Sequence, residues 1–378
     1  MSENLRQLQA YIEELNKRRE VYHEEAGDAI SELYKPRERK HRVPERFNDS
    51  SFLYIRTYAG DIGNRPLPSM NFWNTPDIGF TPITTTTPVS TNELRAGETY
   101  RVACRLHNRG DVTVPYPKVE FFLTDPSIGF DTRFATYVGL SQMDGLLLAN
   151  GVGEAYYNYT VPPQEAGHKC FFARTYSFSP LDKPNNVYAL DPVTDRHVAQ
   201  KNLHIVPQAS PYQFQWIHLP NAQGRLQFQA LTLKEVIGLG DPSLMHLNFR
   251  EFGSAAVFTR QEIKIIEARE GSVEVQRGRQ GFDIISRGEG PEAREQAEIT
   301  KAYNNAIEEF NAGKAKRSQF KDLFTAMKKM HSLQEKTGFQ IMIPPLDLGA
   351  GEAVAVNMVH TNAFTGEVNG GITLVVKG

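Results

Sequence analysis

Residues 93–126, ELRAGETYRVACRLHNRGDVTVPYPKVEFFLTDP, decide the fold class of this chain. Two runs within this stretch, 99–106 and 118–123, are rich in β-branched and aromatic residues, as β-strands are. Residues 108–111, Asn-Arg-Gly-Asp, form a turn signal between the two runs, and Asp125-Pro126 closes the second run. The stretch therefore predicts two strands separated by a turn in a mainly β protein.

Strand-like runs with the same turn punctuation continue on both sides of this stretch. They occupy residues 52–58, 155–161, 169–177 and 201–206. Turn signals rich in Gly, Pro and Asn lie between them. Several short strands separated in this way are typical of an antiparallel β-sandwich. We therefore predict a β-sandwich with an N-terminal extension over residues 51–207.

This region resembles the CARDB-type bacterial Ig-like domain, in which a strand leads into an Asn-x-Gly-type turn and a second alternating strand follows. TVPPQEAGHKCFFARTYS (160–177) and NLHIV (202–206) are similar to the last hairpin of that family. FWNTPDI (72–78) is similar to a segment that often precedes such domains. The resemblance covers residues 70–206, less than half of the chain. It implies an Ig-like sandwich used in adhesion, scaffolding or positioning, without catalytic residues.

The second half of the chain carries its own set of strand candidates, at residues 212–218, 226–233, 254–259, 262–267 and 272–276. The end, GFQIMIPPLDLGAGEAVAVNMVHTNAFTGEVNGGITLVVKG (338–378), repeats an order seen near residues 156–206: a strand, Pro-Pro, a glycine turn, a long strand and a closing strand. An internal repeat of this kind indicates a second copy of one architecture. We therefore predict a second Ig-like antiparallel sandwich over residues 208–378.

Two helical elements accompany the predicted sandwiches. A helical hairpin is expected within the second one, at residues 291–336, with Ile299 on one face of its first helix and Ser318 as the N-cap of its second. An N-terminal helix is expected over residues 1–35, followed by a basic, Pro-containing linker over 36–50. A heptad seam makes this helix a candidate contact for a copy of itself, for a partner or for its own β-domain. The seam residues are Leu5, Leu8, Ile12, Leu15 and Tyr22.

The overall composition excludes some classes of partner. The formal net charge is −2, and a protein that mainly binds nucleic acid would need a strong basic surplus. No stretch has the 18 or so consecutive apolar residues that a membrane-inserted helix requires. The first twenty residues also lack the apolar middle region of a secretory signal, so we expect the chain to be cytoplasmic when synthesised.

Common catalytic motifs are missing from the sequence. It contains no G-x-x-x-x-G-K-[ST] phosphate loop, no G-x-S-x-G elbow and no H-E-x-x-H pair. The closest histidine pairings, His197 with His204 and His168 with Cys170, lack a second pair of ligands at a useful spacing. We therefore predict no catalytic site, no cofactor and no bound metal.

Cys104 and Cys170 are the only cysteines. They fall on two predicted strands that, in an Ig-like sandwich, belong to opposite sheets, where an inter-sheet disulfide would lie. In a chain without a secretory signal, the alternative is a pair of buried reduced thiols. Both alternatives stay open at the level of the sequence.

These observations predict a non-enzymatic structural or interaction protein. It would be a subunit of a larger bacterial assembly, or an adaptor to one, and it would form a homo-oligomer or bind a protein partner. The alternative is a carbohydrate- or peptide-binding accessory module of an exported enzyme system, with Trp73, Tyr116 or Trp216 as a stacking platform. Burial of both indoles would argue against that platform.

Overall fold

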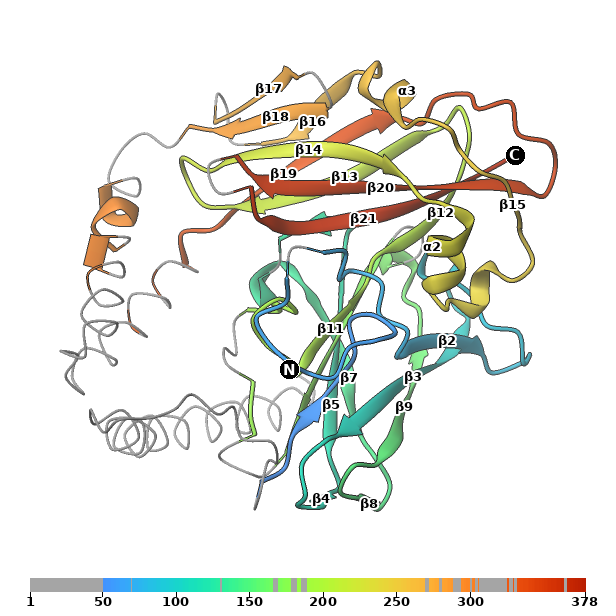
Figure 1. Ribbon diagram of the computed structural model, residues 1–378, viewed down its shortest axis with the longest axis vertical. Helices are drawn as coiled ribbons and strands as arrows, with labels where there is room; N and C mark the ends of the chain where they lie inside the picture. Colours follow the sequence, from blue (N-terminus) through green and yellow to red (C-terminus); the bar gives the residue numbers. More distant parts are fainter. Residues whose placement is uncertain are drawn as a thin grey trace.

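Two pairs of facing β-sheets account for most of the described chain, and their strands run in crossing directions (Figure 1). The computed structural model describes residues 50–378, without residues 69, 130, 166–168, 178–181, 185–188, 269–271, 279–280, 288–293, 300, 303–304, 306–324, 326–328, 330–331 and 364–365. The predicted helix over 1–35 and all but the last residue of the predicted linker lie outside the described residues. The described chain is mainly β, as predicted.

The first pair of sheets is built around a long central strand, β3 (Thr99–Asn108). β9 (Val152–Thr160) pairs along one side of β3, and β2 (Ile78–Pro82) and β1 (Leu53–Tyr54) share the other side. The facing sheet has the order β11 (Val198–Lys201), β10 (Cys170–Tyr176), β5 (Lys118–Thr124), β7 (Thr136–Gln142). The short pair β4 (Val114–Pro115) and β8 (Leu146–Leu147) lies at one end.

Alternation along β3 explains how these sheets enclose a core. Val102, Cys104 and Leu106 are completely buried, whereas Arg101 and Arg105 between them are exposed. Successive side chains of a strand point to opposite faces, so one face of β3 lines the core and the other faces solvent. The result is a sandwich with one solvated face, as the alternating pattern of the sequence predicts.

The second pair of sheets is larger. One sheet has the order β12 (Leu203–Pro207), β21 (Val368–Lys377), β20 (Glu352–Asn362), β14 (Gln223–Ala230), β18 (Gly281–Ser286), β17 (Val273–Arg277). The facing sheet has the order β16 (Ile263–Glu267), β19 (Glu335–Met342), β13 (Pro211–His218), β6 (Ser127–Ile128). Phe214, Phe339 and Trp216 are among the buried side chains between the two sheets.

The second pair of sheets contains parallel as well as antiparallel strands, whereas the sequence predicted antiparallel strands throughout. β12 runs parallel to β21, β6 runs parallel to β13, and β15 (Asn248–Phe249) runs parallel to β20. Two of these strands, β6 and β12, come from the part of the chain assigned to the first sandwich. Parallel pairing arises here because distant segments of the chain cross into the second pair of sheets.

The predicted single strand over 201–206 is wrong, because the chain changes sheets within it. β11 ends at Lys201 in the first pair, and β12 begins at Leu203 in the second. Asn202 lies between them, and its side-chain amide donates hydrogen bonds to the carbonyl oxygens of Ser127 (3.1 Å) and Gly371 (2.8 Å). Burial is continuous from β11 to Val206 of β12, and no glycine or proline separates the two strands, so the sequence could not reveal the change of sheet.

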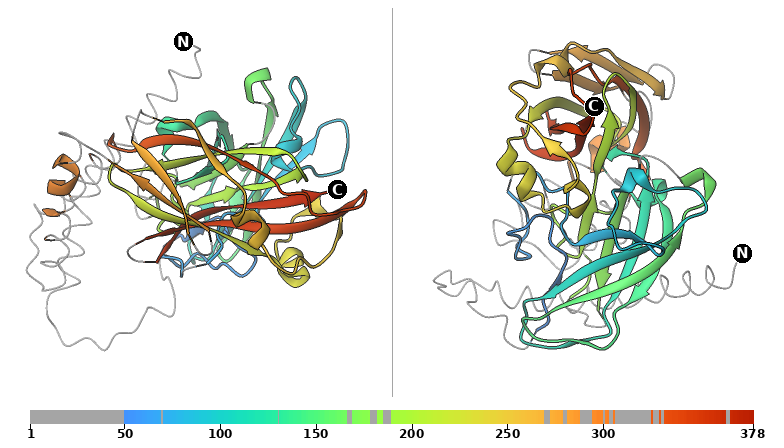
Figure 2. Two further views of the ribbon diagram at one scale, coloured as in Figure 1. Left: turned by 90° about the horizontal axis from the view of Figure 1, so that it is seen from above. Right: turned by 90° about the vertical axis from the view of Figure 1, so that its right-hand side faces the viewer.

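Trp73, from the first half of the chain, contacts the second pair of sheets. Trp73 is fully buried, and its indole N–H donates a 3.0 Å hydrogen bond to the hydroxyl of Thr373 in β21. The ring lies against Gly371, where a β-carbon would come within 2.5 Å of it. Lys201 adds a buried 2.7 Å ion pair with Asp241. The second pair of sheets therefore rests directly on the first, as two further views show (Figure 2).

Other local predictions differ from the structure. Residues 254–259, predicted as a strand, contain helix α3 (Ala256–Thr259). β2, β7 and β18 were not predicted. Helix α2 (Leu233–Gly238) begins at a capping box formed by Thr232 and Glu235, within the predicted strand 226–233.

The predicted helical insert lies between β18 and β19, and only part of it belongs to the described residues. Residues 294–299 are helical, and Ile299 is buried, 8% exposed. Lys329 approaches Glu295 to 3.8 Å across the insert. Ser318 and most of the second predicted helix lie outside the described residues.

Candidate functional site

β4 and β8 lie at the end of the first sandwich that is away from the second pair of sheets (Figure 1). Several large apolar side chains of this end are exposed. The segments 108–116 and 145–152 form this end and are joined by backbone hydrogen bonds from Tyr116 to Gly145 and from Asn150 to Gly110. We call the following exposed residues the apolar tip: Val112 (43% exposed), Tyr116 (49%), Leu146 (55%), Leu148 (61%) and Val152 (60%).

Strand register explains why these side chains are exposed. Val114 of β4 pairs with Leu147 of β8, and both point into the core. Their neighbours Leu146 and Leu148 must then point outward, because side chains alternate along a strand. The run Leu146-Leu147-Leu148 therefore places one leucine in the core and two in solvent. Monomeric proteins rarely expose several large apolar side chains together without a partner for them.

One buried side chain, Asn108, holds the loops of the apolar tip. Its amide oxygen accepts hydrogen bonds from the backbone N–H groups of Phe52 and Gly110, both at 3.0 Å. Its amide nitrogen donates to the carbonyl oxygens of Val112 (2.9 Å) and Leu148 (3.2 Å). A single side chain thus connects three segments of the chain, so the apolar residues are displayed on a fixed frame.

Tyr116 of the apolar tip has an unusual backbone conformation. Its φ angle is 47°, in the left-handed region that residues other than glycine rarely adopt. The N–H of Tyr116 donates to the carbonyl of Gly145 at 2.9 Å, which supports this conformation. Strained backbone of this kind is concentrated at functional sites. It projects the tyrosine ring from the turn between β4 and β5.

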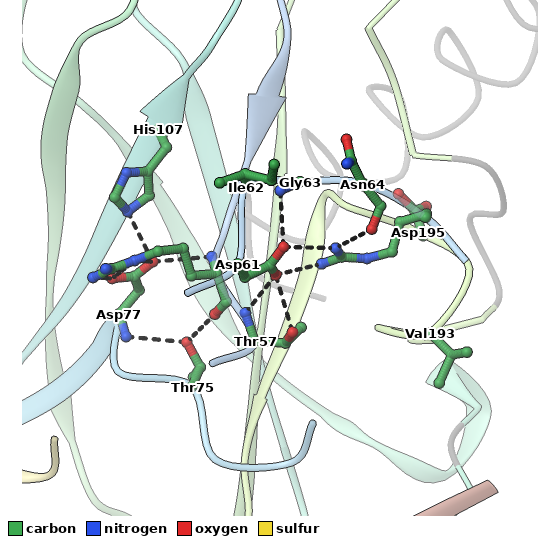
Figure 3. A network of polar contacts seen from close by, with 12 residues as sticks. Thr57, Asp61, Ile62, Gly63, Asn64, Thr75, Asp77, His107, Val193 and Asp195 are labelled. Atoms are coloured by element: carbon green, nitrogen blue, oxygen red, sulfur yellow. Dashed lines mark hydrogen bonds and ion pairs between the residues drawn. The ribbon is translucent and has the colours of Figure 1, made fainter. Parts of the chain in front are cut away.

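Behind the tip, two aspartates form the polar network drawn in Figure 3. The Asp77 carboxylate accepts hydrogen bonds from the His107 ring (2.9 Å) and from the Arg56 guanidinium (2.6 Å). Asp61 pairs with Arg65 at 3.0 Å. Burial raises the pKa of each carboxyl, but these donors and their charges outweigh it, so both pKa values lie below the usual range.

A second buried network surrounds His197. Its ring lies between the carboxylates of Asp182 (3.0 Å) and Asp195 (2.8 Å). Burial lowers the pKa of His197, and the two carboxylates more than offset this, so its pKa is raised. Burial likewise opposes ionisation of Asp182, yet His197 and Arg196 hold its pKa at about 2. Asp182 also accepts the N–H of Leu53 in β1 at 2.8 Å.

These networks attach the segment 50–77 to the sandwich. Asp77 of this segment binds His107 of β3, and Leu53 of the segment binds Asp182, whereas Asp61 binds Thr57 and Arg65 within the segment. Each of these carboxylates is engaged by protein donors. Their arrangement supports a structural role. No signal in the sequence predicted that Asp182 and Asp195 would both contact the His197 ring.

The two cysteines are buried free thiols and do not meet. Cys104 packs in the core between the sheets of the first sandwich. Cys170 points away from that core and packs with Phe122 and Phe172 on the other face of its sheet. Burial raises the pKa of both thiols above the usual range, so neither is a thiolate. The disulfide alternative is therefore not formed.

The remaining predicted site residues divide into two groups. The heptad residues Leu5, Leu8, Ile12, Leu15 and Tyr22 lie outside the described residues. Of the predicted stacking aromatics, Trp73 and Trp216 are buried, 0% and 2% exposed, and only Tyr116 is accessible. A platform made of indole rings is therefore wrong. Tyr116 is instead part of the apolar tip.

An open cleft of about 520 Å³ lies between β14 and α3. Its hydroxyl groups already serve the helix, since Ser254 accepts the N–H of Ala256 (3.2 Å) and Thr259 donates to the carbonyl of Ala256 (2.8 Å). Phe228 is the only aromatic residue that lines it, and this side chain is 9% exposed. The cleft therefore presents no exposed aromatic ring as a stacking surface.

Metal sites and membrane-spanning helices are both absent from the described residues. Within the described residues, no group of three or more His, Cys, Asp or Glu side chains is arranged to hold a metal ion. No helix in this described portion has the length and hydropathy needed to cross a membrane.

Comparison with known proteins identifies no family. No protein-family model matches the chain, and no curated protein matches it. Among solved structures, an adhesin from Mobiluncus mulieris with intramolecular cross-links has 10% identity and a TM-score of 0.20, over 55% of this chain and 91% of its own. The CupB6 tip adhesin from Pseudomonas aeruginosa has 8% identity and a TM-score of 0.19, over 86% and 96%. These neighbours are bacterial adhesins, but similarity at this level assigns neither family nor function.

Proposed function

We propose that this chain is a non-enzymatic interaction protein, a subunit of a larger bacterial assembly or an adaptor to one, that contacts a protein partner through the apolar tip. One observation carries the proposal: five large apolar side chains are exposed together on loops that the buried Asn108 holds in place. The resemblance of residues 70–206 to the CARDB-type domain supports the same kind of role.

The energetics of the apolar tip suit binding. Covering a side chain such as Leu148 or Val152 contributes roughly 1.5–3 kcal/mol when it becomes fully buried. Loops that are already fixed lose little conformational entropy on association, so more of this free energy is available for affinity. Tyr116 adds an aromatic ring of the type that is enriched at the centres of protein interfaces.

The partner is either another protein or a second copy of the chain. Both would cover the same apolar side chains, and both agree with an assembly role. Light scattering on the full chain distinguishes them, because self-association through the tip gives a mass above that of the monomer.

The test is a double substitution, Leu148→Asp with Val152→Asp, which places two charges in the tip. Its matched control is Ile237→Asp with Met245→Asp, at apolar residues that are 80% and 87% exposed on another surface. We expect the tip variant, and not the control, to lose either the oligomer seen by light scattering or the proteins that co-purify quantitatively with the wild-type chain. A monomeric wild type whose co-purifying proteins are the same in both variants would refute the proposal.

A further inference from the structure

A second exposed surface lies on the solvent side of β2, β3 and β9. The strand register places Gly79, Ala103 and Tyr156 in one row across these three strands. Arg101 and Arg105 flank Ala103 along β3, two residues away on either side, and both are exposed. We call these five residues the arginine–tyrosine face. Its two arginines point to solvent because Val102, Cys104 and Leu106 occupy the opposite face of β3.

Tyr156 is held in position before any partner arrives. Its ring is 50% exposed. The Arg101 guanidinium carbon lies 5.2 Å from the ring centroid, a cation–π contact. The tyrosine hydroxyl donates a hydrogen bond to the Glu154 carboxylate. A half-exposed aromatic side chain that is already fixed is the kind of residue that dominates protein interfaces.

Beside Tyr156 the face has a floor of small residues. A β-carbon built on Gly79 would meet no atom within 4 Å, so the space above this residue is open. Ala103, the neighbour of Gly79 across the register, adds only a methyl group. The floor can therefore seat one apolar side chain of a partner against the edge of the Tyr156 ring.

The positive charges of Arg101 and Arg105 favour an anionic partner for this face. Among the described residues, neither Arg101 nor Arg105 forms an ion pair. Glu154 lies opposite Arg105 in the strand register and accepts the Tyr156 hydroxyl, so the two arginines and this carboxylate leave a charge of +1 on the face. Guanidinium groups bind carboxylates through paired, charge-assisted hydrogen bonds, which two exposed arginines offer here. Four residues of strand separate them, or about 13 Å.

We infer that the arginine–tyrosine face binds an acidic, extended protein segment. Two carboxylates of this segment, about four residues apart, would pair with Arg101 and Arg105, and an apolar side chain between them would occupy the floor at Gly79. A flat sheet with tyrosine and arginine suits a protein better than a small ligand, which needs a concave site. The inference rests on the proposed function and extends it, because Val152 of the apolar tip lies on the same side of β9 as Tyr156.

The experiment uses fluorescence anisotropy with the full chain and a labelled nine-residue peptide. The peptide carries two glutamates four positions apart and a leucine midway, within Gly and Ser, and the control peptide has glutamine in place of glutamate. We expect micromolar binding of the acidic peptide only, weakened at least tenfold by Arg101→Glu with Arg105→Glu and by raised salt. The matched control, Lys234→Glu with Arg260→Glu, changes the charge equally on another surface and should bind as the wild type does.

A second variant separates docking from folding. Gly79→Leu fills the floor from a β-carbon position that meets no atom within 4 Å, so the thermal midpoint should stay within about 1 °C of the wild type while peptide binding falls at least tenfold. Equal binding of both peptides, no binding by the wild type, or binding unaffected by either variant overturns the inference. If the arginine variant instead converts an oligomer to a monomer without any peptide binding, the occupant is a second copy. If the acidic peptide does not bind but the tip variant still loses its co-purifying proteins, the proposed function is kept and only this inference fails.

Discussion

The side-chain amide of Asn108 donates a 3.2 Å hydrogen bond to the carbonyl oxygen of Leu148, forty residues further along the chain. Asn108 is the last residue of β3, and Leu148 is the most exposed residue of the apolar tip. A residue at the edge of the core thus determines how an interaction surface is displayed. The stability of the tip and its ability to bind are therefore linked through one side chain.

Replacing Asn108 with Ala should disorder the apolar tip. The change leaves the N–H groups of Phe52 and Gly110 without their acceptor, and we expect the free energy of unfolding to fall by about 2–4 kcal/mol. Urea denaturation measures this loss, and amide hydrogen exchange should accelerate at Phe52 and Gly110. Asn158→Ala, at an exposed position of β9, is the control and should change stability by less than about 0.5 kcal/mol. Unchanged exchange at both amides would show that Asn108 does not hold the tip.

The apolar tip also shows what the sequence could and could not predict. The pattern of strand-like runs separated by turn signals correctly predicted β3, β5, β9 and β10, since β-branched and aromatic residues favour strands. It could not assign Leu146 or Leu148, since a run of three leucines has no polar residue to mark its outer face. Their exposure follows from the pairing of Val114 with Leu147, which depends on tertiary structure.

The change of sheet at Asn202 was hidden from the sequence for a different reason. β11 and β12 are both buried along their length up to Val206, so no exposed position marks a boundary between them. Which neighbour each strand pairs with is decided by β10 and β21, which lie far away in the sequence. The ion networks of Asp77 and Asp182 were missed likewise, because their partners are brought together only by folding.

Cys104 and Cys170 should behave as two inaccessible thiols. They pack on different faces of their sheets, and burial raises the pKa of both, so neither bridging nor thiolate chemistry is expected. Without reductant, we expect a thiol reagent such as DTNB to count two thiols after denaturation and to react at least roughly tenfold more slowly with the folded chain. Fewer than two thiols in the denatured, unreduced protein would contradict the structure and point to a disulfide.

His360 should make the protein sensitive to acid. Its ring is completely buried, it lies 5.6 Å from the Trp216 ring centroid, and neither ring nitrogen has a hydrogen-bond partner in the described part of the chain. Burial, with a smaller effect of His218, lowers the pKa of His360 from 6.5 to about 4. In the unfolded chain the His360 ring is therefore protonated below about pH 6.5, whereas in the folded chain it is protonated only below about pH 4. This favours unfolding by about 3 kcal/mol once the pH has fallen to about 4.

The measurement is the free energy of unfolding in urea at pH 7 and at pH 4.5. His360→Leu removes the titrating group, so the fall in stability between the two pH values should be smaller in this variant than in the wild type by roughly 2–3 kcal/mol. His246→Leu, at an exposed histidine, is the control and should keep the wild-type difference. If both variants lose stability equally on acidification, His360 is not the source of the acid sensitivity.

Thr373 should couple the unfolding of the two pairs of sheets. Its hydroxyl accepts the Trp73 indole N–H at 3.0 Å and donates to the amide oxygen of Asn357 at 2.6 Å. The side-chain amide of Asn74 also donates to this hydroxyl. Thr373→Val keeps the shape of the side chain but removes all three hydrogen bonds, and we expect a loss of about 2–4 kcal/mol. Thr361→Val, at a partly exposed position of β20, is the control and should cost less than about 1 kcal/mol.

Tryptophan fluorescence detects the effect of the same substitution on the joint, which is our name for the contacts of Trp73 with β20 and β21. Trp73 contacts residues of β20 and β21, so its emission changes when the joint opens, whereas circular dichroism follows all the sheets together. In the wild type we expect the two signals to change at one urea concentration, because unfolding either pair of sheets exposes the other. In Thr373→Val the fluorescence transition should come first. Coincident transitions in the variant would show that Lys201, Asn202 and β6 hold the joint without this hydrogen bond.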